Sequence, residues 1–211
     1  NNLNKLNKKM KKIILTAVAV FGFAFANAQE EEKAFGFAKG DVIVEGNLGF
    51  SSTNDKNTEK KTNSFQFNPK VGYFLTDKFV VGVELGVGSD KVEVAGTETD
   101  KNSNFDAGVF GRYYFLDLGK RFKTYAEAGL GMESGKAGLG DAKYSGFGFG
   151  AGLGMNYFVS DSFAINFALT DVLSYSSQKW DGAENVSEFN ANVNVFNNFF
   201  TTAQFGLTYK F

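Results

Sequence analysis

The sequence predicts an all-β fold, and three observations support this prediction. After residue 28, apolar side chains repeatedly occupy every second position, and no segment keeps a helical period. The chain contains 25 Gly and 25 Phe but only 1 Pro, a composition that suits strands and turns. Most of the alternating segments also exceed the roughly 5–6 residues that are typical of strands in soluble proteins. We therefore expect an antiparallel sheet of long strands.

Eight strands account for the chain from residue 40 onward. We expect them at 40–52, 64–75, 79–94, 104–116, 121–133, 144–158, 162–176 and 196–211. Short turns follow every second strand, at 76–78, 117–120 and 160–161. Longer polar loops lie between the other pairs, at 53–63, 95–103, 134–143 and 177–195. Because this alternation is typical of barrels with one short-turn rim and one long-loop rim, we predict an eight-stranded antiparallel up-and-down transmembrane β-barrel. An amphipathic sandwich of a soluble protein is the alternative.

Each strand has an apolar face and a polar face. Hardly a charge lies on the apolar face, where a charge near the middle of a bilayer costs roughly 2–4 kcal/mol. The opposite face collects the charges of Glu45, Lys70, Glu84, Asp106, Arg112, Lys123, Glu127 and Lys210. The lumen of an eight-stranded barrel is only just wide enough for its side chains, so these charges have to pair with one another.

Two interpretations of this charge network remain open. The favoured one is a static salt-bridge core, in which Arg112 bridges Glu84 and Glu127 on the neighbouring strands. The other is a charged plug that gates a narrow path through the barrel.

An aromatic pair precedes each short turn. The pairs are Tyr73-Phe74, Tyr114-Phe115 and Tyr157-Phe158, spaced by 41 and then 43 residues. A propeller repeats at about 40–45 residues, but each of its blades needs four short strands, and only two long strands fit here. We therefore interpret the pairs as an aromatic girdle at one rim of the barrel.

The sixth strand carries glycine at every inward position, namely Gly146, Gly148, Gly150, Gly152 and Gly154. Glycine lets bulky neighbours approach the backbone, so we expect the inward side chains of Phe110, Arg112, Tyr114 and Tyr125 to fill this space. A side pocket for a small apolar ligand is the alternative.

The N-terminal part of the chain is expected to be a targeting segment. Lysines surround Met10, an apolar run follows at 13–25, and the small residues Ala26 and Ala28 precede Gln29. This is the layout of a secretory signal peptide. We expect residues 1–28 to comprise an upstream extension, at 1–9, and a signal peptide, residues 29–39 to form a short periplasmic segment, and residues 40–211 to form the barrel. A buried N-terminal helix is the alternative.

Two motifs of the chain resemble those of a known family. The run Gly72-Tyr73-Phe74-Leu75-Thr76-Asp77-Lys78-Phe79 and the ending Tyr209-Lys210-Phe211 are similar to those of small eight-stranded outer-membrane barrels of the OmpA/OmpX type, in the single-domain form common in Bacteroidetes. The resemblance implies a cell outer membrane location, contact with outer-membrane lipid and a monomer. It also implies that the barrel assembly machinery recognises Phe211, and that Tyr73, Phe115, Tyr157 and Tyr209 belong to the girdle.

Composition limits the possible functions. The chain has no Cys, which excludes a thiolate metal site and a cysteine nucleophile, and no His, the usual general base. We therefore expect no catalytic residue, no cofactor and no metal. Without the five lysines of residues 1–28, 17 basic and 23 acidic side chains remain, so we expect no nucleic-acid partner.

Three functional classes remain. The first is a structural or surface-interaction barrel that contacts an extracellular partner through loop 177–195. The second is a narrow passive channel or small-ligand transporter. The third, an enzyme acting on lipid, is the least favoured because of the missing histidine.

Overall fold

The computed structural model describes residues 35–168, 172–191 and 204–211. They belong to one compact unit, Ala34–Phe211; the other unit, Asn1–Lys33, which includes the expected signal peptide, lies outside the described residues. The described strands are β1 (Val42–Asp55), β2 (Lys60–Phe74), β3 (Phe79–Val94), β4 (Thr97–Leu118), β5 (Phe122–Ala137), β6 (Ala142–Phe158), β7 (Phe163–Ala168), β8 (Leu173–Trp180), β9 (Asn185–Ala191) and β10 (Gln204–Lys210). No helix in these residues is long and apolar enough to cross a membrane.

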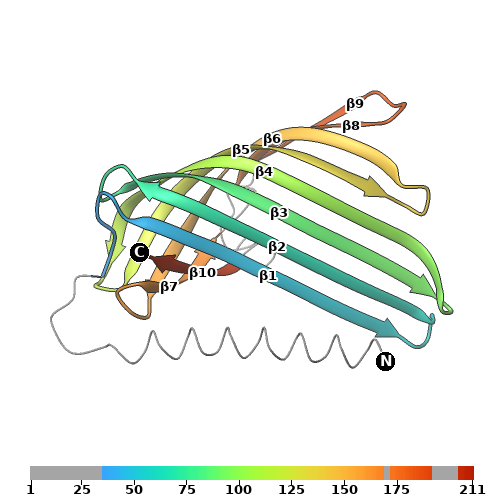
Figure 1. Ribbon diagram of the computed structural model, residues 1–211, viewed down its shortest axis with the longest axis horizontal. Helices are drawn as coiled ribbons and strands as arrows, with labels where there is room; N and C mark the ends of the chain where they lie inside the picture. Colours follow the sequence, from blue (N-terminus) through green and yellow to red (C-terminus); the bar gives the residue numbers. More distant parts are fainter. Residues whose placement is uncertain (1–34, 169–171, 192–203) are drawn as a thin grey trace. The chain divides into compact units, whose positions relative to one another are not determined.

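The strands close into a ring of antiparallel neighbours (Figure 1). The order is β5-β4-β3-β2-β1-β10-β7-β6, and the pairing of β5 with β6 completes the ring. β7 and β8 pair with successive parts of β6, so they are two parts of the seventh wall strand. β10 pairs with β7 and with β1 and so closes the ring as the eighth wall strand, whereas β9 pairs only with β8 among the described strands. The eight-stranded antiparallel barrel predicted from the sequence is confirmed.

The two rims differ from the prediction in one respect. At one rim, which we call the near rim, short turns join the strands at 75–78, 119–121 and 159–162, as expected. We call the opposite rim the far rim. At the far rim, the connections are equally short, at 56–59, 95–96, 138–141 and 181–184. The prediction of four long loops is therefore wrong, because the strands themselves continue to the tips of the hairpins (Figure 1).

Polar side chains in these extended hairpins explain the error. Lys91 pairs with Glu93 on the same strand and with Glu98 across the β3–β4 hairpin, at 2.9 and 2.8 Å, next to a register shift between Val92 and Glu93. Ala95 and Gly96 both have positive φ, of 48° and 78°, which suits a two-residue hairpin turn. A run of polar residues here therefore marks the end of the apolar band and not the end of the strand.

Burial confirms the predicted alternation of faces. The outer face is apolar from Phe65 to Tyr73 on β2 and from Phe79 to Val87 on β3, with large exposed side chains at alternate positions. These lengths match the roughly 9–11 residues with which a tilted strand crosses the hydrocarbon of a bilayer. The inner face holds the buried side chains of Ile43, Glu45, Phe74, Val80, Phe110, Arg112, Tyr114, Tyr125, Asn156, Phe158, Ala164, Asn166 and Thr208. Ser177 is also buried, but it lies opposite the exposed Phe147 in the register.

A register shift interrupts the alternation on β4. Tyr114 pairs with Tyr125, but Leu116 and not Phe115 pairs with Thr124. The extra residue has the geometry of a β-bulge, which lets Phe115 and Leu116 both face outward.

Candidate functional site

Aromatic side chains pack together inside the barrel at the near rim. Phe74, Tyr114 and Phe158 are the buried members of the three aromatic pairs. The ring of Phe37 lies among them, with centroid distances of 4.4 Å to Phe74, 4.8 Å to Tyr114 and 5.1 Å to Phe158. Rings at such separations attract one another beyond the effect of the area that they bury. We call these four residues the aromatic layer. They join the segment before β1, residues 35–41, to β2, β4 and β6.

Polar contacts also hold this segment at the near rim. The Lys210 ammonium donates a hydrogen bond to the Gly36 carbonyl, at 2.8 Å, and lies 3.8 Å from the Asp41 carboxylate. The Lys39 backbone N–H donates to the Asp77 carboxylate, at 2.8 Å. No pattern in the sequence predicts these contacts, because the segment lies outside the strands.

A chain of neutral hydrogen bonds links the aromatic layer to a buried carboxylate. The Tyr114 hydroxyl donates to the Asn156 side-chain carbonyl, and the Asn156 amide donates to the Thr208 hydroxyl, at 2.8 and 3.0 Å. The Thr208 hydroxyl and the Asn166 amide donate to Glu45, at 2.8 and 3.2 Å. Within the described residues, no buried side-chain nitrogen or oxygen lacks a partner. The buried polar side chains of the interior are therefore satisfied by hydrogen bonds.

Five charged side chains form a connected network, which we call the ion cluster. Both terminal nitrogens of Arg112 donate to the two oxygens of Glu45, at 2.7 and 2.6 Å. The Arg112 Nε donates to Glu127, at 2.7 Å. Lys70 lies 2.7 Å from both Glu127 and Glu84. Since the Arg112 side chain is only 2% exposed, its charge depends on these carboxylates for compensation.

The expected partners of Arg112 are partly wrong. Glu127 is bound, but the second carboxylate is Glu45 of β1 and not Glu84, which Lys70 binds instead. The prediction considered only the strands adjacent to β4. In so narrow a barrel, a long side chain also reaches strands across the lumen.

The other three charges of the expected network lie outside the ion cluster. Asp106 accepts a hydrogen bond from the Asn104 amide, at 2.7 Å. Lys123 pairs with Asp117 at 2.7 Å, in the register that follows the bulge on β4. The third, Lys210, binds the segment before β1.

The aromatic pairs divide between the two faces. Tyr73, Phe115 and Tyr209 are exposed on the outer face near the near rim, as is Phe211, whose ring lies 4.7 Å from that of Tyr209. Tyr157 contacts Phe122 there, with centroids 4.7 Å apart. Because consecutive residues of a strand point to opposite faces, only one member of each pair can join the girdle. The outward members are Tyr73, Phe115 and Tyr157, the three expected in the girdle, and the other member of each pair belongs to the interior.

Sequence reasoning missed several interior residues. Asn156, Asn166 and Thr208 occupy inward positions of strands, so the alternation of faces could have identified them. The predicted lumen network included only charged residues and gave no weight to uncharged polar ones. Phe37 carries no such signal.

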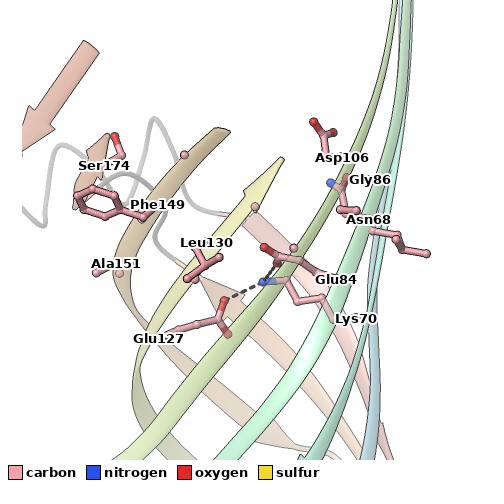
Figure 2. A pocket seen from close by; sticks show the side chains of 18 of the residues that line it. Asn68, Lys70, Glu84, Gly86, Asp106, Glu127, Leu130, Phe149, Ala151 and Ser174 are labelled. Atoms are coloured by element: carbon pink, nitrogen blue, oxygen red, sulfur yellow. Dashed lines mark hydrogen bonds and ion pairs between the residues drawn. The ribbon is translucent and has the colours of Figure 1, made fainter. Parts of the chain in front are cut away.

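A cavity of about 470 Å³ lies on the far-rim side of the ion cluster (Figure 2). Figure 2 shows Lys70 between Glu84 and Glu127, with Asp106 further along the cavity wall. The glycine-rich inner faces of β5 and β6 contribute main chain to the opposite wall. No group of three or more His, Cys, Asp or Glu side chains in the described part of the chain is arranged to hold a metal ion.

Glycines make room for two of the four expected side chains, although not all of these glycines lie on β6. A Cβ atom at Gly154 would overlap the ring of Tyr125, so that part of the prediction is confirmed. Phe110 instead lies against Gly82 of β3, where a Cβ would come within 2.6 Å of the ring. A Cβ at Gly148 or Gly150 would meet mainly backbone, and both residues line the cavity.

The family of the chain follows from a sequence comparison. Residues 16–211 match the model of the outer membrane protein beta-barrel domain. The chain belongs to this family. Curated protein sequences give no significant match.

Several solved outer-membrane barrels have a similar fold. OprG from Pseudomonas aeruginosa is 18% identical, with coverage of 83% of this chain and 98% of that chain and a TM-score of 0.48. Neisserial surface protein A is 17% identical, with coverage of 81% and 96% and a TM-score of 0.42. The Escherichia coli outer membrane protein W is 17% identical, with coverage of 82% and 99% and a TM-score of 0.41.

Membership of this family gives the barrel its location. The protein is an integral protein of the outer membrane, and the apolar band faces lipid. At the near rim, the Phe211 N–H donates to the Val42 carbonyl at 2.9 Å.

Proposed function

We propose that this outer-membrane barrel has a structural or surface-interaction role, with a plugged lumen and no catalysis. The observation that carries the proposal is the succession of the aromatic layer and the ion cluster along the interior. Arg112 and Glu45, which belong to different sides of the wall, are 2% and 6% exposed. A solute crossing the barrel would have to separate them, which leaves a buried charge without its partner.

The absence of catalysis is proposed on chemical grounds. Glu45, Glu84 and Glu127 could act as acids or bases, but each is bound to Arg112 or Lys70. The chain has no histidine that could serve as a general base or acid.

We also propose that the near rim is periplasmic and that the extended hairpins of the far rim are extracellular, because the longer projections of bacterial outer-membrane barrels face outward. These hairpins are the proposed contact surface. The described part of the predicted loop 177–195 is largely the β8–β9 hairpin, and the rest lies outside the described residues. Val186 and Phe189 on β9 are 65% and 61% exposed. Apolar side chains on a rigid projection suit contact with another surface molecule. We also propose that the protein is a monomer and that the assembly machinery recognises Phe211.

Conductance in planar lipid bilayers tests the plug. We expect no discrete channels from the wild-type protein, and channels from a folded double variant, Phe37→Ala with Arg112→Ala, in which both layers are opened. Stable wild-type channels would overturn the plug in favour of the alternative function, a narrow passive channel or small-ligand transporter. Retained hairpin-dependent binding to cells would still support a surface role.

A further inference from the structure

The part of the lumen between the ion cluster and the far rim is a cavity. The charged side chains of the ion cluster form its floor. Its volume, about 470 Å³, lies within the range of roughly 300–1,000 Å³ that small-molecule sites occupy. Because the ion cluster forms the floor, a molecule that enters from the extracellular side would be bound without passing through. This cavity belongs to neither of the functions proposed above.

The walls of the cavity carry an excess of negative charge. Among its lining residues, Glu45, Glu84 and Glu127 are bound to Arg112 or Lys70. The lining also includes two further carboxylates, those of Asp106 and Glu133. They accept hydrogen bonds from the neutral amides of Asn104, at 2.7 Å, and Gln178, at 3.2 Å. Within the described residues, neither forms an ion pair.

These two carboxylates are direct neighbours. Asp106 of β4 and Glu133 of β5 are opposite each other in the register and both face the lumen. Like charges at directly opposed positions destabilise a sheet. A cation between them would remove the repulsion, and the described residues supply none there.

Glycines on both sides keep the space around this pair open. The cross-strand row runs Gly86, Asp106, Glu133, Gly146, Gln178. A Cβ at Gly86 would lie 2.7 Å from the Asp106 carboxylate, and one at Gly146 would lie 2.9 Å from the Glu133 carboxylate. The two carboxylates therefore lie against the glycines of the neighbouring strands and leave the centre of the lumen free.

An aromatic pair lies next to the row, toward the extracellular rim. Tyr144 and Trp180 are opposite each other in the register, two residues beyond Gly146 and Gln178, and their ring centroids are 4.8 Å apart. A Cβ at Gly135 would overlap the Tyr144 ring, so this ring also covers a glycine. Aromatic faces attract organic cations.

We propose that the cavity binds a small linear organic cation with more than one ammonium group. One ammonium lies between Asp106 and Glu133, another reaches toward Glu84, and the hydrocarbon between them lies along the glycine wall. The aromatic pair attracts the cation at the entrance. An anion would meet the unpaired carboxylates and be excluded.

Fluorescence of Trp180 gives a direct readout, because it is the only Trp in the chain. The full chain, folded in detergent at physiological salt, is titrated with spermidine and, for comparison, with sodium glutamate, and calorimetry checks the affinity. We expect saturable binding of spermidine and none of glutamate.

Two lumen variants and one matched control separate a site from general charge attraction. Asp106→Asn with Glu133→Gln should weaken spermidine binding by about 10-fold or more. Gly150→Leu, where a Cβ would come no closer than 3.6 Å to other atoms, should fill the cavity and abolish binding without changing charge. Glu93→Gln with Glu98→Gln removes the same charge from the exposed hairpin and should leave binding unchanged. Equal weakening in this control, no effect of the folded lumen variants, or no saturable binding would each overturn the proposal.

Discussion

The guanidinium of Arg112 donates hydrogen bonds to Glu45 and Glu127, and it also lies over the Tyr125 ring, 4.1 Å from the centroid. A planar group with several donors suits two carboxylates and an aromatic face at once, which Lys cannot match. At the scale of single residues, the interior of the barrel therefore depends on a few side chains with several partners each.

Arg112→Ala is expected to destabilise the folded barrel by roughly 3–5 kcal/mol, because it leaves Glu45 buried without its cation. The midpoint of urea unfolding measures this change. Arg121→Ala is the matched control, since Arg121 donates to the neutral carbonyls of Phe158 and Val159, both at 3.2 Å, and lies over the Phe35 ring, but pairs with no carboxylate among the described residues; it should cost about 1 kcal/mol. Equal losses in the two variants would show that burial of the ion pair is not the cause.

Phe37→Ala is expected to cost about 1.5–3 kcal/mol, the value of the apolar burial of one aromatic side chain. The loss should be accompanied by faster hydrogen exchange at Lys39, whose N–H binds Asp77. Phe189→Ala on the exposed β9 hairpin serves as the control and should change stability by less than about 0.5 kcal/mol. Unchanged stability and exchange in Phe37→Ala would contradict the role of the aromatic layer.

At the scale of secondary-structure elements, the last strand combines two tasks. β10 closes the ring between β1 and β7, with Tyr209 facing lipid and Lys210 facing inward. The same strand thus presents the outer girdle and holds the segment before β1.

Deletion of Phe211 is expected to reduce the assembled fraction in the outer membrane strongly. Lys210→Ala should still assemble, because it removes contacts to Gly36 and Asp41 and leaves the outer face intact. Heat-modifiable gel mobility of outer-membrane fractions measures assembly. The same assembly defect in both variants would contradict the assignment of Phe211 to the girdle.

The β3–β4 hairpin of the far rim allows a test by titration. The hydrogen bond from Lys91 lowers the pKa of the Glu93 carboxyl below its ordinary value. The carboxylate is therefore favoured in the folded hairpin, and its stabilising effect is present above the ordinary pKa and lost as the pH falls through the lowered one. In Lys91→Met, the pKa of Glu93, followed by NMR, should rise toward its ordinary value; the absence of a shift would exclude this contact in solution.

At the scale of the whole molecule, closure of the ring brings together residues far apart in the chain. The hydrogen bond from Thr208 to Glu45 and the contacts of Lys210 with the segment before β1 both depend on the pairing of β1 with β10. Removal of either terminal strand, β1 or β10, would therefore open the interior.

Secretion determines which part of the chain is present in the mature protein. We predict that the mature protein begins at Gln29, since Ala26 and Ala28 satisfy the small-residue preference before a cleavage site. Mass spectrometry of the protein from outer membranes decides this. Retention of residues 13–25 in the mature protein would contradict the signal peptide.

The amino-acid sequence by itself determined the barrel and its two faces. A period of two is local, so each strand reports which of its side chains face lipid and which face the lumen, and Glu45, Arg112 and Thr208 could all be placed inside. The sequence was less informative about where the strands end. Polar residues such as Lys91 and Glu98 lie outside the apolar band but still within the strands.

Only the tertiary structure decided which interior residues meet across the lumen. Glu45 and Arg112 are 67 residues apart, and their pairing depends on the tilt and register of the closed ring, which no local pattern encodes. The same holds for Phe37, which lies outside any strand and reaches its aromatic partners only because β2, β4 and β6 bring their near-rim ends around it. The period of a strand is local, whereas contacts across a lumen are set by the geometry of all eight wall strands at once.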